Sequence, residues 1–461
     1  MAQDPNNLNI WTVTLENYEV KPIEDGRTNK LQYLYKAIAN YNWVDCTMPD
    51  GDNQNYNFGF DGAGAGIYNL TFTANTTAKT VELTAVEKVF TACFDNSNTE
   101  WENVYAWAWT EGGENYSGGT WPGIKLTKKD AEGHYMFKVT SNVPNYGPAN
   151  IIFNNGDGTQ TANLTFVNDK VYAPVCFANN SGWENVYAYT YNNATAGAWP
   201  GTQLTTTNSK GFYVFLNDDA ANIIFNNGAD VQSPDFEFIS GATYVSIDEN
   251  VDYTPAAVEN AVIWLKRTGV NTENWSTFSV PFAISNADLK AAFGDGVAVA
   301  KYSEEAVGES STVSFDKMET PAIEANKPVL LKGTHEGADF VFNGSIEKGD
   351  PKVEGTNFDF VGNYAGEADV EEGDYFLSAD KLFRSKGETT ILGTRAYIKA
   401  KTADARIGSM IIDGESSETT GISDIENGSH SNGAIYNLNG QRVTNPAKGV
   451  FIINGKKVVV K

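Results

Sequence analysis

An internal repeat constrains the fold of this chain more than any other feature. "WENVYA" begins at Trp101 and again at Trp183, and "WPG" begins at Trp121 and again at Trp199. "NIIFNNG" begins at Asn150 and again at Asn222. The spacing between the copies decreases from each block to the next, so extra residues lie between fixed blocks of the first copy, and such insertions belong in loops. Two copies of about eighty residues each predict two small β-sandwiches rather than a solenoid.

The repeat also sets the predicted domain organisation. We place the first copy at residues 89–173 and the second at 174–252, joined by "VYAPVCF", which contains no Gly/Ser linker. Residues 1–88 hold strand-like runs, including an alternating segment around a polar turn that is typical of a hairpin. Residues 259–415 contain many short strand candidates separated by Gly, Asp and Asn. Both flanking segments are therefore expected to be further β-domains, the second of them a β-sandwich.

The end of the chain has a different character. "SNADLKAAFG", from Ser285 to Gly294, is the one clear short helix that the sequence predicts, with a Ser cap and a closing Gly. Residues 420–461 read as a polar linker followed by a β tail, in which "LNGQ" and "INGK" carry the Asn-Gly signal of tight hairpins. The predicted fold class is all-β, with several β-sandwich domains in tandem and a short C-terminal β tail.

Charge and hydropathy exclude some partners. The net charge of −25 repels phosphate backbones and anionic lipid, so we expect no nucleic-acid partner, and an uncharged ligand is not discouraged. No apolar run reaches the length of a membrane span, and "MAQDPNN" reads as a mature N-terminus with a starting Met rather than a signal peptide. The three cysteines, Cys46, Cys93 and Cys176, are expected to be buried thiols.

Each copy carries an aromatic strand. "VYAWAW" (Val104 to Trp109) and "VYAYTY" (Val186 to Tyr191) alternate small and ring-bearing residues. Successive side chains of a strand point to opposite faces, so one face of each strand carries three rings. A core would normally take such rings inside, and a ligand or a protein partner is the alternative.

The other repeated blocks favour a ligand. The residue before a proline is extended and Pro-Gly suits the centre of a type II turn, so Trp121 and Trp199 are expected at solvent-accessible corners. Gln160 and Gln232 follow the two Asn-Asn-Gly turns at equal distances. Aromatic faces match the apolar C–H groups of a pyranose, and amides match its hydroxyls. In the opposing interpretation the rings fill a core and Asn-Asn-Gly is only a hairpin, but the whole set recurs.

"WENVYAYTYNNATAGAWPGTQLT" with "IIFNNGADVQ" resembles the starch-binding carbohydrate-binding modules of family 26, and so does the first copy. The resemblance implies a β-sandwich that binds α-1,4-glucan without catalysis through two strand aromatics and the Trp of Trp-Pro-Gly. The first copy departs from the pattern by the insertion "TEGGENYSGG", which adds Tyr116 as a candidate contact. Together with the two glutamines, the candidate carbohydrate-binding residues are Tyr105, Trp107, Trp121, Gln160, Tyr187, Tyr189, Trp199 and Gln232.

The tail has a resemblance of its own. "IYNLNGQRV…KGVFIINGKKVVVK" is similar to C-terminal sequences of proteins that type IX secretion sorts to a cell surface. The resemblance implies an extracellular or surface-attached protein.

No catalytic constellation is visible. A glycosidase needs two carboxylates across a sugar site, and no local motif singles out a pair. The three histidines are scattered, so we predict no metal site and no cofactor. "DNSNTE" and "NNGDGT" could hold calcium but are more typical of turns, so calcium stays open. The prediction is a non-catalytic protein whose partners are starch, maltooligosaccharides and other glycan-utilisation proteins at the surface. A structural or adhesive protein whose aromatic faces bind another protein, and a fragment or partner of an amylase, remain open.

Overall fold

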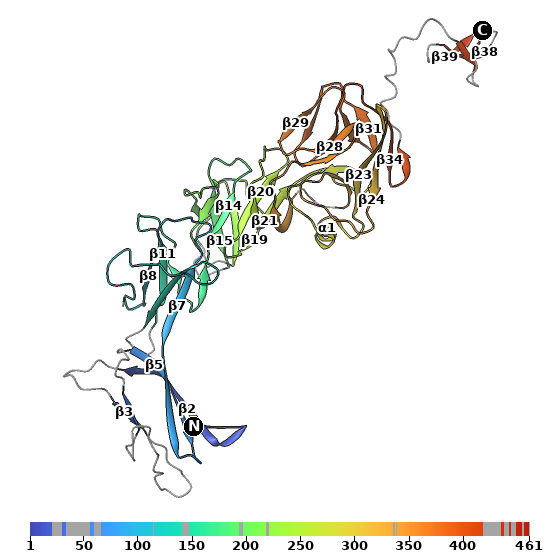
Figure 1. The fold of residues 1–461 in the computed structure, drawn as a ribbon. Coiled ribbons are helices and arrows are strands. Elements are labelled where there is room, and N and C mark those ends of the chain that lie inside the picture. Colours follow the sequence, from blue (N-terminus) through green and yellow to red (C-terminus); the bar gives the residue numbers. More distant parts are fainter. Residues whose placement is uncertain are drawn as a thin grey trace. The chain divides into compact units, whose positions relative to one another are not determined.

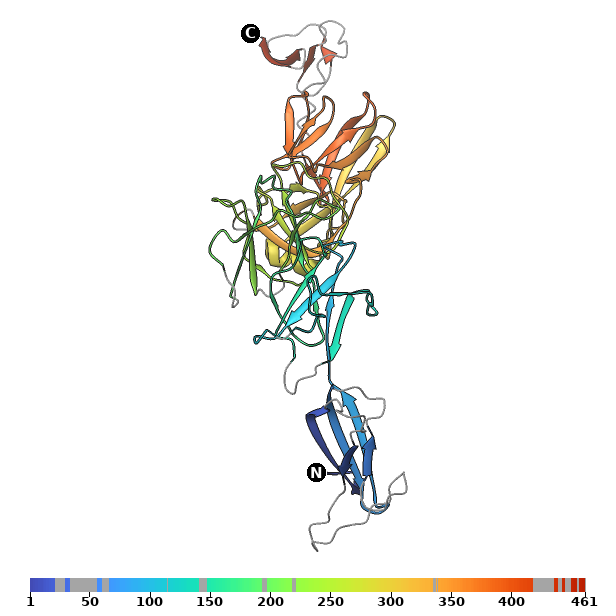
Figure 2. The same ribbon diagram turned by 90° about the vertical axis from the view of Figure 1, so that its left-hand side faces the viewer.

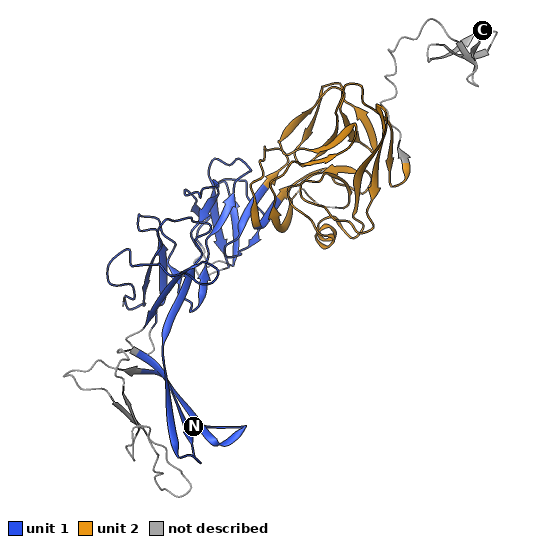
Figure 3. Cartoon of the chain, in the orientation of Figure 1, with its two compact units in different colours: residues 1–246, 260–264 blue, residues 247–259, 265–461 orange. Residues whose placement is uncertain are grey.

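A computed structural model describes most of the chain. The described residues are 1–20, 30–33, 56–59, 66–113, 115–140, 147–192, 197–217, 221–334, 337, 339–417 and four short strand segments between 435 and 460. The chain divides into two compact units, residues 1–246 with 260–264 and residues 247–259 with 265–461 (Figure 3). This division does not separate the five predicted domains, whose boundaries stay predictions.

The first unit begins with an antiparallel sheet of order β1-β2-β5-β6 (Figure 1). Its apolar side chains Leu70 and Phe72 are buried, as the alternation of the segment requires. The predicted hairpin is confirmed, because Asn75 pairs with Thr80 across the polar turn. The strands are β1 (Ala2–Asp4), β2 (Asn7–Val20), β5 (Gly66–Asn75) and β6 (Thr80–Glu87), and β3 (Lys30–Tyr33) pairs separately with β4 (Tyr56–Gly59).

The first repeat is a β-sandwich. Its two sheets have the orders β10-β7-β13 and β12-β11-β8-β9, and they enclose a core that includes Phe94, Phe137 and Phe153. The strands are β7 (Val89–Phe94), β8 (Tyr105–Trp109), β9 (Ile124–Lys125), β10 (Tyr135–Thr140), β11 (Asn150–Asn154), β12 (Leu164–Thr165) and β13 (Lys170–Tyr172).

The second repeat has the same topology. Strand β14 pairs with β17 and β20 in one sheet, and the other sheet has the order β16-β15-β18-β19. Phe177 and Phe225 stack in its core with ring centroids 4.4 Å apart. The repeated motifs therefore fold into the same strands twice. These strands are β14 (Val175–Ala178), β15 (Tyr187–Tyr191), β16 (Thr202–Gln203), β17 (Tyr213–Phe215), β18 (Asn222–Asn226), β19 (Phe236–Glu237) and β20 (Thr243–Asp248).

Side-chain hydrogen bonds join the two repeats. The Asn98 amide donates to the carbonyl oxygens of Pro174 and Gly241, at 2.9 and 3.0 Å. The Glu100 carboxylate accepts hydrogen bonds from the backbone N–H and the hydroxyl of Ser209, at 2.6 and 2.8 Å. The loop before β8 thus contacts the turn before β17.

The second unit contains two larger sheets, yellow to orange-red in the ribbon views (Figure 1; Figure 2). Their orders are β22-β25-β23-β24-β34-β35 and β27-β28-β33-β30-β31, and a shared core joins Phe315 and Met410 of the first to Phe360 and Ile398 of the second. The strands are β22 (Ser276–Phe278), β23 (Ala298–Val307), β24 (Ser310–Lys317), β25 (Val329–Lys332), β27 (Lys352–Glu354), β28 (Phe358–Gly362), β30 (Tyr375–Ser378), β31 (Lys381–Arg384), β33 (Ala396–Ala400), β34 (Arg406–Ile412) and β35 (Glu415–Ser417).

The fold contains one described helix and two short antiparallel pairs in the tail. The predicted helix is confirmed as α1 (Asn286–Phe293), where the Ser285 side chain accepts a hydrogen bond from the Asp288 backbone N–H. In the tail, the strands that flank each Asn-Gly pair are antiparallel neighbours: β36 (Ile435–Asn437) with β37 (Arg442–Val443), and β38 (Gly449–Ile453) with β39 (Lys456–Val460).

The prediction of three buried thiols is only partly right. Cys176 is a buried free thiol, but Cys93 is only half-buried, because it lies on the outward face of β7 between the inward-facing Ala92 and Phe94. Cys46 lies outside the described residues. Among the described helices, none has the length and apolar character that crossing a membrane would require.

Candidate functional site

The aromatic strands direct their rings away from the core. In β8, Ala106 and Ala108 are fully buried, whereas Tyr105, Trp107 and Trp109 on the opposite face are half-buried. Strand β15 repeats the pattern, with its small residues buried and its three tyrosines half-buried. The alanines fill the sandwich, and this excludes the interpretation in which the rings form the core.

An exposed indole stands beside the strand rings in each copy. The side chains of Trp121 and Trp199 are 49% and 45% exposed. The ring centroids of Trp107 and Trp121 lie 5.9 Å apart at an interplanar angle of 56°, and those of Tyr189 and Trp199 lie 5.4 Å apart at 64°. Two rings set at such an angle form an aromatic corner that is open to solvent.

The turn that presents each indole differs from the prediction. The Trp121-Pro122 and Trp199-Pro200 peptide bonds are cis, and the backbone N–H of Gly123 donates to the carbonyl of Thr120 at 2.9 Å. Trp and Pro therefore occupy the two central positions of a type VI turn, and the expected type II turn centred on Pro-Gly is wrong. The glycine serves another purpose, because a Cβ on Gly123 would lie 2.2 Å from the carbonyl oxygen of Ala106 in β8.

The first Asn of each Asn-Asn-Gly block connects the repeated motifs. The buried Asn154 amide donates to the Pro122 carbonyl at 3.1 Å, and its Oδ1 accepts from the Gly156 backbone N–H at 3.0 Å. Asn226 makes the equivalent bond to the Pro200 carbonyl at 3.0 Å. One buried side chain thus holds the Trp-Pro-Gly turn and the Asn-Asn-Gly turn together.

The glycine of Asn-Asn-Gly makes room for a strand ring. A Cβ on Gly156 would lie 2.7 Å from Cε2 of Tyr105, and one on Gly228 would lie 2.6 Å from Cε2 of Tyr187. Each tyrosine ring therefore rests directly on the turn. This contact explains why the turn carries glycine in both copies.

The predicted glutamines lie at the end of the same turns. Gln160 forms an isolated bridge with Asn154, and Gln232 forms one with Asn226, and both glutamine side chains are exposed. All eight candidate residues thus stand on β8 or β15, or on the turns that the buried asparagines join. Asn154 pairs with Tyr105 and Asn226 pairs with Tyr187, so in each sheet the asparagine lies between the glutamine and a strand ring.

The structure also places residues that the sequence reading left out. Tyr191 stacks on Tyr189, with centroids 6.0 Å apart and an interplanar angle of 18°. Burial and a hydrogen bond with Asp235 raise the pKa of Tyr191, so its phenol stays neutral. In the sequence, Tyr191 could have been found as the third ring-bearing residue in the alternation of "VYAYTY". Tyr116, by contrast, packs against the core and lines a separate hollow of about 630 Å³ that none of the candidate rings of its copy lines.

A turn of the first copy brings metal-ligand residue types together. One ligand atom each of Asp130, Glu132 and His134 lies within 4.8 Å of the others, and His134 Nδ1 is 2.8 Å from Asp130 Oδ2. Asp130 Oδ1 also accepts backbone N–H bonds that shape the turn, and Asn208 does the same in the second copy. The side-chain oxygen at this position is therefore explained by its hydrogen bonds within the turn, without a metal ion.

Comparisons with known proteins show what the repeats are similar to. Residues 92–166 and 175–238 match the family described as starch-binding module 26. An α-amylase of Butyrivibrio fibrisolvens is 31% identical in a region that covers 28% of this chain and 17% of the amylase, so the chain spans less than a fifth of that relative.

Among solved structures, the crystal structure of CBMbc (family CBM26) from Eubacterium rectale Amy13K in complex with maltoheptaose is similar. It is 18% identical, and the match covers 38% of this chain and 92% of that chain with a TM-score of 0.15. The family match falls on each repeat in turn, so the chain carries two tandem segments that are similar to the starch-binding module 26 family.

Proposed function

We propose that this protein binds α-glucan, as starch or maltooligosaccharide, through an aromatic platform on each repeat. The observation that carries the proposal is the exposed indole set at an angle to a strand ring in both copies. In the first copy the platform consists of Tyr105, Trp107 and Trp121 with Gln160 at its margin. In the second it consists of Tyr187, Tyr189 and Trp199 with Gln232.

The chemistry of the platforms suits a neutral, polyhydroxylated polymer. The C–H faces of glucose are apolar and weakly positive, and they match the negative faces of the rings. The two glutamine amides offer both donors and acceptors to sugar hydroxyls. None of the eight residues carries a charge, which fits an uncharged ligand on a protein of net charge −25.

We further propose that the chain itself does not cleave glucan. The family that matches the repeats is a family of binding modules, and none of the eight platform residues is a carboxylic acid. A place outside the cell or on its surface, alongside other glycan-utilisation proteins, also belongs to the proposal. It is supported by the resemblance of the tail to sorting sequences and by the partial match to an amylase.

The direct test is electrophoresis of the full chain in native gels with and without soluble starch. Starch should retard the wild-type protein. The double variant that combines Trp121→Ala and Trp199→Ala should migrate equally far with and without starch. Tyr135→Ala is a matched control, because Tyr135 is a half-buried ring on the other sheet of the first copy. Equal retardation of the double variant and the wild type would refute the platform assignment.

A further inference from the structure

The second unit contains a hollow that the glucan platforms do not explain. It measures about 490 Å³, within the range of small-ligand sites, and it lies against β22, β30 and the strand β32 (Thr389–Leu392). Of the described residues that line it, Arg395 alone carries a charge. A lining whose one charged residue is basic is unusual for a chain with 58 acidic and 33 basic residues.

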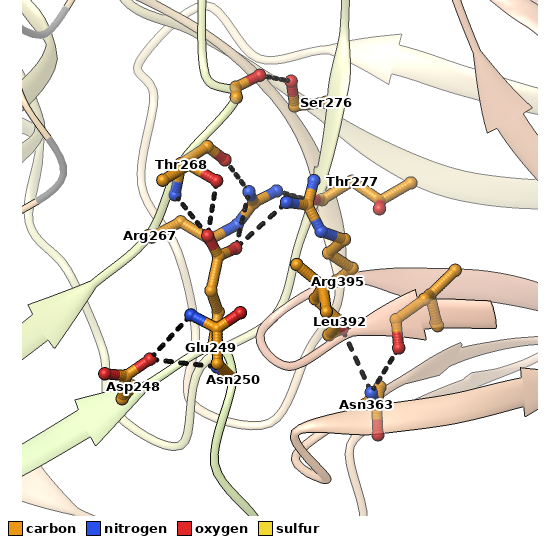
Figure 4. A network of polar contacts seen from close by, with 12 residues as sticks. Asp248, Glu249, Asn250, Arg267, Thr268, Ser276, Thr277, Asn363, Leu392 and Arg395 are labelled. Carbon is orange, nitrogen blue, oxygen red and sulfur yellow. Dashed lines mark hydrogen bonds and ion pairs between the residues drawn. The ribbon is translucent and has the colours of Figure 1, made fainter. Parts of the chain in front are cut away.

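Arg395 belongs to a buried network with an excess of positive charge (Figure 4). The Glu249 carboxylate, only 3% exposed, lies 3.3 Å from Nη1 of Arg267 and 3.0 Å from Nη2 of Arg395. The Arg267 side chain is fully buried, and its Nη2 donates to the Thr277 carbonyl at 3.0 Å. Two guanidinium groups therefore share one carboxylate.

The excess charge has a physical consequence. Burial, together with the nearby charge of Arg395, lowers the pKa of Arg267 to about 9 despite the Glu249 carboxylate. Among the described residues, the Nε of Arg267 has no hydrogen-bond partner. Buried charges that lack a partner are costly, so one further negative charge beside the pair would stabilise the network.

The hollow leaves the Arg395 guanidinium group approachable. Gly269 lines it, and a Cβ there would lie 3.6 Å from Arg395 Nη1 and 3.8 Å from Arg267 Nη1. The absent side chain leaves this side of the Arg395 guanidinium group clear. Arg395 uses Nη2 for Glu249 and is a quarter exposed, so part of its planar fork faces the hollow.

The rest of the lining suits a sugar-like ring. Trp275 supplies an aromatic surface, and its position is held by a hydrogen bond from its backbone N–H to Asp380 Oδ1 at 2.6 Å. Asn274, Ser378 and Thr389 add amide and hydroxyl groups whose side chains form no hydrogen bond within the described part of the protein. An aromatic face with several hydroxyl partners matches a pyranose, as on the repeats.

We propose that this hollow binds a sugar acid of about the size of a hexuronate, with its single carboxylate on Arg395 and its ring against Trp275. One negative charge balances the network of two arginines and one glutamate. The charge distinguishes this ligand from the neutral glucan of the repeats, so the second unit recognises a different glycan class.

The test is saturation-transfer NMR of the full chain with D-glucuronate, and with its uncharged methyl ester as the matched ligand. Glucuronate should bind at millimolar concentration and the ester about tenfold more weakly, because the ester lacks the charge-assisted hydrogen bonds. Arg395→Gln should weaken glucuronate binding about tenfold. This variant leaves Arg267 and Glu249 as an ion pair whose opposite charges cancel, so the fold should persist.

Further variants keep the test decisive. Ser378 is exposed, so Ser378→Glu should fold and exclude the anion, whereas Ser378→Gln, which has the same size without the charge, should still bind it. Lys301→Gln removes a positive charge elsewhere in the unit and should change nothing. No glucuronate signal from the wild type, or a signal from Arg395→Gln and Ser378→Glu that equals that of the wild type, overturns the site. Equally strong, Arg395-dependent binding of inorganic phosphate overturns the sugar acid as its ligand.

Discussion

The side-chain amide of Asn226 donates a hydrogen bond to the carbonyl oxygen of Pro200, 3.0 Å away, and Asn154 repeats this bond to Pro122. The bond joins two turns that are well separated in the sequence. It positions the exposed indole of Trp199 relative to the turn on which Tyr187 rests. The geometry of each platform therefore depends on a buried residue that touches no ligand in the proposed site.

Replacing Asn226 by Ala should weaken both the fold and the site. The Pro200 carbonyl and the Gly228 N–H would lose their partner, which costs about 1–3 kcal/mol in the free energy of unfolding. Chemical denaturation measures that loss. Starch affinity, measured in a Trp121→Ala background that silences the first platform, should fall as well. Unchanged affinity in that background would show that the bond does not position the indole.

Replacing Gly228 by Ala should displace the Tyr187 ring, because the new Cβ would meet it at 2.6 Å. Gly211→Ala is the matched control: its backbone has a similar positive φ, 78° against 81°, but nothing lies within 4 Å of the added Cβ. Both variants carry the same kind of backbone strain. We expect only Gly228→Ala to lower glucan affinity beyond its effect on stability, as titrations of both variants can show. Equal losses of glucan affinity in the two variants would mean that backbone strain alone causes the loss.

Replacing Glu100 by Ala should reduce the advantage of having two modules. The variant removes both hydrogen bonds to Ser209, so the second platform is held less firmly near the first. Linked sites that reach one polymer can gain about 10²–10⁴ in avidity, and that gain depends on their geometry. Adsorption to insoluble starch should weaken while maltoheptaose affinity stays the same. The exposed Glu102→Ala variant is the control, and equal adsorption of the two variants would count against a coupled pair.

Deleting residues 421–461 should leave starch affinity intact in vitro. The segment lacks Trp, and its one Tyr and one Phe are too few for a stacking platform. The truncated protein should accumulate in a different place in cells, as fractionation can show. Loss of starch binding after this deletion would mean that the tail serves the glucan site.

The sequence was most informative where local patterns decide the structure. The alternation in "VYAWAW" predicted a strand with three rings on one face, and the Ser285 cap and Gly294 predicted α1. The local preference of Pro-Gly indicated the wrong turn, because it does not reveal the bond from Asn154 or the close approach of Gly123 to β8.

Long-range contacts escaped the sequence reading altogether. Glu249 and Arg395 lie far apart in the sequence, and no motif connects them. Only the packing of the second unit brings their charges together with Arg267, so no local pattern could have indicated the hollow beside them.

The central claim is that each repeat holds one glucan platform, and the stoichiometry of maltoheptaose binding tests it most directly. Isothermal titration calorimetry of the full chain should give two sites. Trp121→Ala and Trp199→Ala should each leave one, because truncation of a central aromatic residue costs about 2 kcal/mol or more. The double variant should show none. Two sites of wild-type affinity in the double variant would contradict the account.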